Sequence, residues 1–479
     1  MTLTVDQAAG KIHQLVGDEG FLGTSRNDNM QSVRKLLGQF GPADEDKIVA
    51  KLSDADLKKL AGNVNHGGIF GAQGLDGGEK KDLFNGLARG LDGKQLGRVA
   101  AAFSDRSDVT ALGDSVASFA SSQAKIDFVK SLAPAATSGD TKFDTSWGTS
   151  SIQTGDKEAI AISHVLSSMK NDPAGFATAV KSLDADQLQA VVKAGEGQTV
   201  ITTSSMTDGG LGAASATTTS TFDTAGLQSL LGAASACNDP IAKARVFEAG
   251  TKALDDIHGA DTLLTPSPGA KDSAKAVAGG LTKLMNSDTR GIVNRLDTDD
   301  PFGHALTTYL KQQLGDDPKA SNPAIGRQVA MLQGAGTGKT ADQFYNTAEV
   351  GSNGDHFYRN AQNLGYYAGA MQAAIGKLKA DAKTQGDILS NVFSTAISVG
   401  TAAMPGLSVA AKVGAQAFSG LTKEAVREIV GGVSADDGSL SNALMDLAVP
   451  HAPGQLDRTR GPADPFFLSA SNAVSGANP

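Results

Sequence analysis

The stretch that decides the fold of the N-terminal half is LDADQLQAVVKA, residues 183–194, which closely matches LDGKQLGRVAAA, residues 91–102. A looser copy, LSDADLKKLA, begins at Leu52. Recurrence of one segment within a chain is the signature of repeat architectures, in which stacked units bury faces that one unit alone cannot bury. The sequence therefore predicts a diverged repeat over residues 51–258, preceded by a short N-terminal helical segment over residues 1–50.

A second matching pair marks the places where helices begin. SSMKNDPAGFA, residues 167–177, matches ASACNDPIAKA, residues 234–244. The shared Asn-Asp-Pro is a helix start, because aspartate is a favoured N-cap and proline loses nothing at the first helical position. We expect helices to start at Pro173 and Pro240.

Two segments rich in Thr and Ser interrupt the helical pattern, at residues 137–155 and 199–224. Both alternate β-branched or aromatic residues with small polar ones, which is typical of strands, and Asp208-Gly209-Gly210 supplies a turn in the second. We predict β-hairpins that project from the helical units. The glycine-rich residues 62–78 occupy the equivalent place in the first unit and are expected to form a loop.

The second half of the chain is expected to be a separate helical domain. Residues 259–273 contain Thr265-Pro266-Ser267-Pro268-Gly269 and are the best candidate for a linker. The regular helical pattern then covers residues 274–449, and the tail over 450–479 is expected to be disordered except where Phe466-Phe467-Leu468 could dock. The predicted fold class is mainly α: N-terminal diverged helical repeats that carry β-hairpins, followed by a C-terminal α-helical bundle domain.

Charge and cysteine content exclude several kinds of function. The 479-residue chain has a net charge of −9 and no basic stripe, so nucleic-acid binding is not expected. The one cysteine, Cys237, allows neither an internal disulfide nor a multi-cysteine metal site, and it sits beside a helix break, where a small packed residue is expected. The first residues lack the apolar core of a Sec signal peptide.

No motif in the sequence assigns catalytic, cofactor-binding or metal-ligating residues. QGAGTGKT, residues 333–340, is similar to a phosphate-binding loop, but the first glycine of that motif should stand where the chain has Gln333. We expect a glycine-rich connection there and no cofactor. The seven histidines form no zinc pair. Asp355-His356, close to several aromatic residues, is the alternative: an unrecognised enzyme site.

A long helix is predicted over residues 356–379, with its apolar residues in one stripe. Gly365 and Gly369 form a G-x-x-x-G on an adjacent face, which allows a second helix to approach closely. The simpler interpretation is a core helix of the C-terminal domain. The alternative is a partner-binding helix with an exposed tyrosine face made of Tyr358, Tyr366 and Tyr367.

ILSNVFSTAISVGTAAMPGLSVAA, residues 388–411, contains no charged residue. Pro405-Gly406 interrupts it, because proline cannot continue a helix without losing a backbone hydrogen bond. The sequence therefore predicts a helical hairpin over residues 388–418, which is either a soluble core hairpin or one that enters a membrane under some conditions. The residues expected to carry a membrane-entering hairpin are Ile388, Phe393, Ile397, Val399, Pro405, Gly406, Leu407 and Val409.

Taken together, these features resemble exported bacterial effectors of the harpin and type III translocator kind. The shared features are Gly, Ala and Ser richness, acidity, scarcity of Cys and Trp, N-terminal repeats and a weakly apolar C-terminal hairpin. The resemblance implies a protein that leaves the bacterial cytoplasm by a route without a Sec signal and acts at another cell. It transfers no catalytic residues.

Two functions follow as hypotheses beside the enzyme alternative. The first is a non-enzymatic interaction protein that binds a protein partner through its repeats, their hairpins and its C-terminal helices. The second is a pore-forming or membrane-translocating protein that uses the hairpin at 388–418. The sequence identifies neither the partner nor the oligomeric state.

Overall fold

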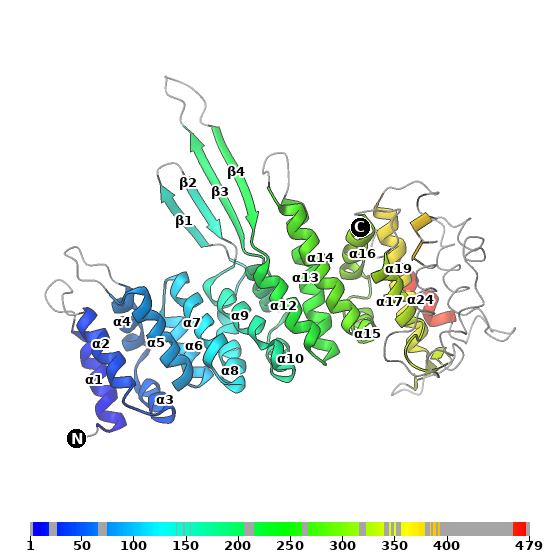
Figure 1. Cartoon of the computed structure of the whole chain (residues 1–479). Helices are drawn as coiled ribbons and strands as arrows, with labels where there is room; N and C mark the ends of the chain where they lie inside the picture. Colours follow the sequence, from blue (N-terminus) through cyan, green and yellow to red (C-terminus); the bar gives the residue numbers. More distant parts are fainter. Residues whose placement is uncertain are drawn as a thin grey trace. The chain divides into compact units, whose positions relative to one another are not determined.

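The computed structural model shows a mainly α-helical chain, as predicted (Figure 1). It divides into two compact units: unit 1 comprises residues 1–242 and 256–277, and unit 2 comprises residues 243–255 and 278–479. The long helices α13 (Pro240–Ala260) and α14 (Ala270–Ser287) contribute to both units. The structure describes residues 3–18, 26–65, 74–139, 141–146, 149–153, 155–205, 215–260, 267–315, 322–339, 344–345, 349–350, 356–378, 384, 387–388, 391–392 and 463–475.

Unit 1 is built from antiparallel helices stacked in two layers. One layer runs α1, α3, α5, α7, α9 and α12, and the other runs α2, α4, α6, α8 and α10, with each helix in contact with the next of its own layer. This arrangement is an α-solenoid, in which every unit packs mainly on its neighbours. The helices are α1 Val5–Gly17, α2 Arg26–Leu37, α3 Pro42–Lys51, α4 Asp54–Asn65, α5 Gly77–Gly90, α6 Gly93–Ala102, α7 Arg106–Phe119, α8 Ser122–Leu132, α9 Lys157–Ser168, α10 Pro173–Ser182, α11 Ala185–Gly195 and α12 Ala225–Ala236.

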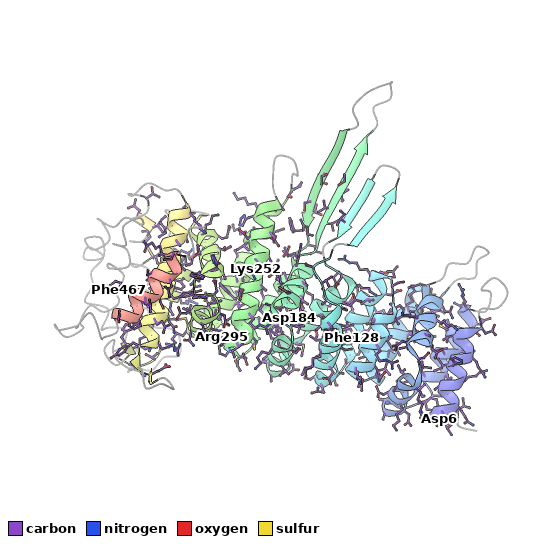
Figure 2. All side chains as sticks on the ribbon, turned by 180° about the vertical axis from the view of Figure 1, so that it is seen from behind. Asp6, Phe128, Asp184, Lys252, Arg295 and Phe467 are labelled. Carbon is purple, nitrogen blue, oxygen red and sulfur yellow. The ribbon has the colours of Figure 1, made fainter. Side chains whose placement is uncertain are left out.

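The matching Leu-Asp segments are the turns between two helices of one hairpin. Leu91 caps the C-terminus of α5, and Asp92 caps the N-terminus of α6 by accepting from the Gln95 N–H at 2.8 Å. Leu183 and Asp184 do the same between α10 and α11, where Asp184 is labelled in Figure 2. The two leucines are buried, so each turn combines a capping hydrogen bond with an apolar anchor.

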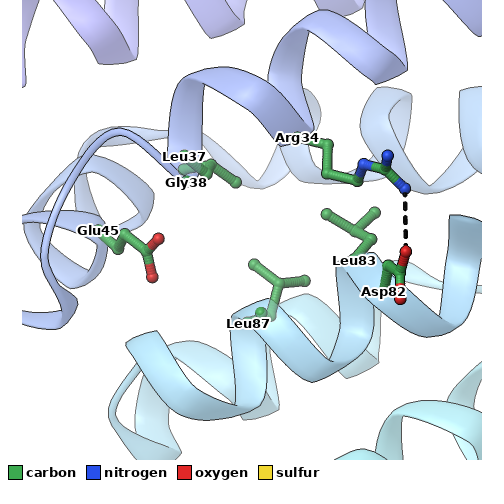
Figure 3. A pocket seen from close by; sticks show the side chains of 8 residues that line it. Arg34, Leu37, Gly38, Glu45, Asp82, Leu83 and Leu87 are labelled. Atoms are coloured by element: carbon green, nitrogen blue, oxygen red, sulfur yellow. Dashed lines mark hydrogen bonds and ion pairs between the residues drawn. The ribbon is translucent and has the colours of Figure 1, made fainter.

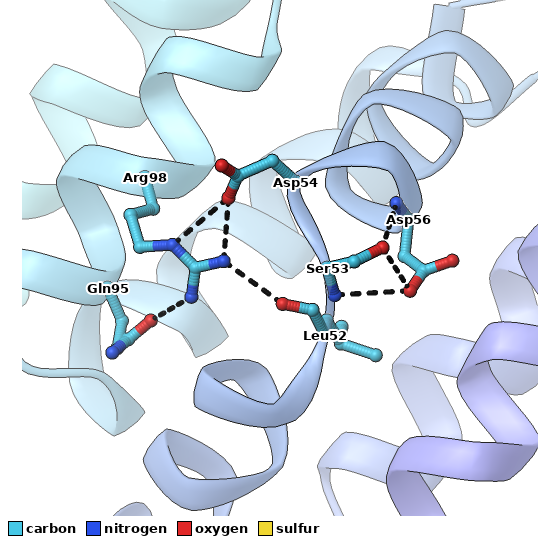
Figure 4. Close-up of polar contacts among 6 residues, drawn as sticks. All are labelled: Leu52, Ser53, Asp54, Asp56, Gln95 and Arg98. Carbon is cyan, nitrogen blue, oxygen red and sulfur yellow. Dashed lines mark hydrogen bonds and ion pairs between the residues drawn. The ribbon is translucent and has the colours of Figure 1, made fainter.

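Polar contacts between successive hairpins reinforce the stack, and the best defined involves Arg98 of α6 (Figure 4). Its guanidinium donates to Asp54 Oδ1 at 2.7 Å and to the Leu52 carbonyl at 3.0 Å. The same side chain donates to Gln95 Oε1 at 2.8 Å, so three acceptors hold its position. Arg98 therefore ties the turn before α4 to the face of α6.

The two predicted β-hairpins are present, and they join into one sheet. Strands β1 (Thr141–Ser146) and β2 (Thr149–Gln153) lie between α8 and α9, and β3 (Gln198–Ser205) and β4 (Ser215–Phe222) lie between α11 and α12. All pairs are antiparallel in the order β1-β2-β3-β4, with Ile152 opposite Val200 where the two hairpins meet. The sheet extends away from the helices of unit 1 (Figure 1). Of the expected loop at 62–78, residues 66–73 lie outside the described residues, and the remainder includes the ends of α4 and α5.

A polar network centred on the buried Gln328 lies at the core of unit 2. The Gln328 amide donates to Tyr309 Oη at 2.9 Å and to Asn286 Oδ1 at 3.0 Å, and it accepts from the Tyr367 hydroxyl at 2.7 Å. Both the nitrogen and the oxygen of the Gln328 amide are therefore hydrogen-bonded. A low-dielectric interior requires this, because an unpaired polar group there is costly. The elements of this unit include α15 Thr289–Asp299, α16 His304–Gly315, α17 Pro323–Leu332, α19 Arg359–Lys377, α24 Ala463–Ser475 and the short pair β5 Glu349–Val350 and β6 His356–Phe357.

The C-terminal helix α24 packs on α19 through the predicted G-x-x-x-G. A Cβ added at Gly365 would lie 2.2 Å from the Phe466 carbonyl oxygen, and one added at Gly369 would lie 2.4 Å from that of Ala470. The two backbones can approach this closely only because both glycines lack side chains. The expectation of disorder over 450–479 is wrong for residues 463–465 and 469–475, which are helical. The docking expected at Phe466-Phe467-Leu468 is confirmed for Phe466, which is fully buried, whereas Leu468 is exposed.

The acidic residues Asp297, Asp299 and Asp300 lie at the junction between α15 and α16, and α16 begins at His304. Asp300 follows the last residue of α15 and accepts from the Ala305 N–H at 2.9 Å. Gly303 has φ +65° between the two helices, a backbone conformation that glycine adopts without strain.

The glycine-rich residues after α17 form a connection, as expected. Gly334, Gly336 and Gly338 all have positive φ values, of 93°, 81° and 71°. Thr340 lies outside the described residues.

Most of the predicted helical hairpin at 388–418 also lies outside the described residues. Of this segment the structure describes Ile388, Asn391 and Val392, and the side chains of Ile388 and Val392 are buried. Of the predicted linker at 259–273, residues 259–260 belong to α13 and residues 270–273 to α14.

We predict that Gly365→Ala destabilises unit 2, because the new methyl group would meet backbone atoms of α24 that cannot move aside. Overpacking of this kind costs about 1–3 kcal/mol. Gly376→Ala on the same helix is the matched control, since nothing lies within 4 Å of its added Cβ, and alanine there should raise helix stability slightly. Thermal unfolding distinguishes the two, and equal stability of both variants would contradict the docking of α24.

Candidate functional site

The candidate site is a groove of about 860 Å³ in unit 1 at the base of the hairpin sheet, called the sheet-base groove below. It is bounded by α7, α9, the end of α11, the first residues of β3 and the start of α12. The sheet-base groove thus lies where the inserted hairpins leave the helical array. Its polar lining includes Asp105, Arg106, Ser107, Asp114, His164 and Asp223.

One wall of the sheet-base groove is the N-terminal part of α7. Asp105 caps this helix by accepting from the Ser107 N–H at 2.7 Å and from the Ser107 hydroxyl at 2.6 Å. The hydrogen bond from the Ser107 side chain lowers the pKa of Asp105, so this carboxylate remains charged well into the acid range. Arg106 donates to the Gly155 carbonyl at 2.9 Å, which ties α7 to the segment that follows the first hairpin.

A side-chain contact joins the neighbouring helices α7 and α9. Asp114 Oδ1 contacts His164 Nδ1, and both side chains are more than a third exposed. A contact this exposed contributes little to stability, because water competes for both groups. Both groups are therefore open to a bound partner.

Three glycines set the floor of the sheet-base groove. Gly195 and Gly226 face each other so closely that a Cβ on Gly226 would lie 3.2 Å from the Gly195 carbonyl oxygen. Gly197 has φ +58°, and a Cβ there would lie 2.4 Å from the Asp223 carbonyl oxygen. The chain can therefore turn from α11 into β3 directly beside the start of α12. Because none of the three glycines has a side chain, none of them fills the groove.

Glu196 lies between two of these glycines and is fully buried. Among the described residues neither of its carboxyl oxygens has a hydrogen-bond partner. Burial, together with the charge of Asp256, raises the pKa of Glu196 to about 9. The carboxyl group is consequently neutral at physiological pH, which removes most of the cost of burying it.

The side chains that line the sheet-base groove carry a net negative charge. Asp105, Asp114 and Asp223 line it together with one arginine, Arg106, which keeps its positive charge while it donates to the Gly155 carbonyl. Carboxylates around a partly water-excluded hollow raise the local concentration of cations and favour basic partners. The groove is therefore suited to a polar chain segment that carries lysine or arginine.

A smaller pocket of about 330 Å³ lies between α2, α3 and α5 (Figure 3). The ion pair between Arg34 and Asp82 borders it at 3.5 Å, and Leu83 and Leu87 supply apolar walls. Burial raises the pKa of Glu45, which also lines this pocket. The Glu45 carboxylate packs so closely on Gly90 that the pocket is part of the stacking contact between two hairpins.

The structure places the sequence-predicted site residues elsewhere. Tyr366 and Tyr367 are completely buried in unit 2, so the proposed exposed tyrosine face is wrong, because these rings fill the core instead. Tyr366 donates to the Asp300 carbonyl at 2.8 Å, and Tyr358 is half-buried. Asp355 lies outside the described residues, as do the side chain of His356 and the membrane-hairpin candidates Phe393, Ile397, Val399, Pro405, Gly406, Leu407 and Val409.

The residues of the sheet-base groove were not found from the sequence. Asp105 and Asp223 are separated by more than a hundred residues, and no motif connects them. The sequence contains one related signal. Each Thr/Ser-rich insertion directly precedes a helix, and these two helices, α9 and α12, belong to the same layer. Side chains at the base of two such insertions must come together when successive units stack.

Within the described ranges, no group of three or more His, Cys, Asp or Glu residues could hold a metal ion. In the same ranges, no helix is long and apolar enough to cross a membrane. The pore-forming hypothesis rests on residues outside these ranges and stays a prediction.

No protein-family model, no curated protein and no solved structure matches this chain. The class of the protein is therefore defined by its own architecture. Unit 1 is an α-solenoid with an inserted four-stranded sheet and an acidic groove at its base, and unit 2 is a helical bundle closed by its C-terminal helix.

We predict that the buried Glu196 makes the protein less stable as pH rises. Its ordinary pKa is 4.5 and its folded value is about 9, so between these values the native state keeps a proton that the unfolded state has lost. The free energy of unfolding therefore falls with rising pH, by about 3 kcal/mol at pH 7 relative to pH 4.5.

Glu196→Gln removes this titration while keeping the shape of the side chain. The variant should be more stable than the wild type at pH 8 and about equal to it at pH 4.5, as measured by urea unfolding. A variant that parallels the wild type at every pH would show that Glu196 is not buried in its neutral form.

Proposed function

We propose that this protein is a non-enzymatic interaction protein that binds a basic polypeptide segment in the sheet-base groove. The observation that carries the proposal is the groove itself, which combines an open hollow, acidic side chains and a rigid helical frame. Solenoids commonly bind partners along extended surfaces made by successive units, because each unit adds one step of the same surface. The inserted sheet adds a second wall that a plain helical array lacks.

The rigidity of the frame supports binding. Helix α7, which carries Asp114 and is capped by Asp105, is anchored by that cap and by the buried side chains of Val109, Leu112 and Val116, so its backbone needs little ordering when a partner binds. Preorganisation of this kind improves affinity by lowering the entropic cost of association. The exposed Asp114–His164 pair can exchange its internal contact for one with a basic side chain of the partner.

The resemblance to exported bacterial effectors further supports a partner outside the producing cell. We propose that the chain leaves the bacterial cytoplasm without a Sec signal and meets its partner there. Detection of the full chain in culture supernatant, with a cytoplasmic marker absent, tests this part separately from binding.

Filling the sheet-base groove should weaken partner binding. Peptides selected from a displayed random library against the full chain should be enriched in Lys and Arg, and Ala111→Trp should weaken their binding at least about tenfold, or about 1.4 kcal/mol. Asp114→Asn should weaken it less and reduce its salt dependence. Fluorescence polarisation with the selected peptides measures each effect.

Ser118→Trp is the control, because Ser118 is exposed on the same helix but does not line the groove. It should bind the selected peptides as the wild type does. Selected peptides without basic residues, or binding that Ala111→Trp leaves unchanged, would contradict the proposed function.

A further inference from the structure

The smaller pocket of unit 1, called the α2–α3–α5 pocket below, has the composition of a small-molecule site (Figure 3). Its volume is about 330 Å³, near the lower end of the range of about 300–1,000 Å³ that such sites span. Leu37, Leu83 and Leu87 line it, and all three are buried, so the packing of the helices fixes their positions. An apolar lining with a few polar groups is typical of a site for an organic ligand.

The charged side chains of the α2–α3–α5 pocket do not balance. Glu45 and Asp82 contribute two negative charges and Arg34 contributes one positive charge, which gives a net charge of −1. Arg34 and Asp82 pair with each other at 3.5 Å. The charge that remains is therefore that of Glu45, which Figure 3 shows with its carboxylate turned toward the other lining side chains.

Glu45 has no counter-ion within the described ranges. No hydrogen bond or ion pair joins it to a described residue, and burial raises its pKa without a neighbouring donor or cation that lowers it. The first lysine of α3, Lys47, pairs with Asp44 at 2.9 Å. Arg89, in the last turn of α5, places its guanidinium 4.2 Å from the centroid of the Phe119 ring. The cationic side chains of these two elements are thus directed to other groups.

The end of α5 adds to the negative potential at Glu45. Gly90 is the last residue of this helix, and a Cβ added there would collide with Glu45 Oε2. The carboxylate therefore lies against the C-terminal end of α5, where the last carbonyl groups of a helix carry a partial negative charge. A second negative group is unfavourable at this place, whereas a cation would be attracted by both the carboxylate and the helix end.

We propose that the α2–α3–α5 pocket binds a small organic cation of the primary alkylammonium class. The ammonium group pairs with the Glu45 carboxylate, and the aliphatic chain lies against Leu83 and Leu87. A bare divalent metal ion does not suit this pocket, because such ions take six or more oxygen ligands and most of the lining is apolar. The site is separate from the sheet-base groove and does not depend on binding there.

The probe is n-hexylammonium at about pH 7, where an alkylamine is a cation. Titration into the full chain, labelled at its leucine methyl groups, should give saturable shifts of the Leu83 and Leu87 resonances with a dissociation constant of about 1 mM. Hexanoate and 1-hexanol carry an anionic and a neutral head on the same chain, so both should bind at least about tenfold more weakly. No saturable shift, or equal binding of hexanoate, would overturn the proposal.

Glu45→Gln tests the carboxylate, because it removes the charge and keeps the shape of the side chain. It should weaken binding of n-hexylammonium at least about tenfold. Asp44→Asn is the matched control, since it removes a charge of the same sign one residue earlier and does not line the pocket. It should bind the probe as the wild type does. Equal weakening by both variants would mean that only the overall charge attracts the probe, which contradicts the proposed site.

Gly86→Leu tests the cavity without removing any existing contact. Gly86 lines the pocket, and nothing lies within 4 Å of an added Cβ, so a leucine fits on α5 and its side chain would occupy the space. Leucine is a better helix former than glycine, so the variant should stay folded, as thermal unfolding will show. Binding of n-hexylammonium should be lost.

Gly10→Leu is the matched control for this substitution. Gly10 is exposed on α1, has nothing within 4 Å of an added Cβ and does not line the pocket. The variant should bind n-hexylammonium as the wild type does. A folded Gly86→Leu variant that still binds the probe would overturn the proposal, and so would equal loss of binding in both glycine variants.

Discussion

Every helical hairpin of unit 1 depends on its neighbours to cover its apolar faces. Leu96 and Val99 of α6 are buried, as are Phe128 and Val129 of α8, and these two helices pack against each other. A single hairpin would leave such residues in water at a cost of roughly 1.5–3 kcal/mol for each large side chain. Several stacked hairpins are therefore needed for a stable fold, and the capped turns between helices allow the same hairpin to recur along the chain.

The inserted hairpins follow from the same stacking. Each is attached before a helix of the same layer, α9 in one case and α12 in the other, and these two helices are in contact. Their strands β2 and β3 are therefore brought side by side and pair. A two-stranded hairpin alone is marginal in water, so this joining of two insertions makes a sheet that can project from the helices.

Unit 2 uses a different means to specify one packing. Its centre contains Tyr309, Gln328 and Tyr367, whose polar atoms bond to one another and are shielded from water. A second polar contact joins Ser469 of α24 to Asp297 of α15 at 3.2 Å, and burial raises the pKa of Asp297 to about 6. Contacts with such strict geometry disfavour alternative arrangements of the helices, and they place α24 at one position on α19.

The sequence by itself determined the local features of the protein. The Leu-Asp turns, the aspartates before Pro173 and Pro240, the two hairpins and the close-packing Gly365 and Gly369 all depend on residues near one another in the chain. Each follows from backbone capping, strand periodicity or side-chain size, and these act over a few residues. This is why the mainly α fold class and its β insertions could be predicted.

Only the tertiary structure decided which distant segments meet. It paired β2 with β3, brought Asp105 and Asp223 to one groove, decided that the tyrosines of α19 belong to the core and form no exposed face, and placed α24 against Gly365. The neutral state of Glu196 likewise depends on burial, which no local pattern records. These outcomes depend on how successive units stack, and stacking depends on shape complementarity between residues far apart in the chain.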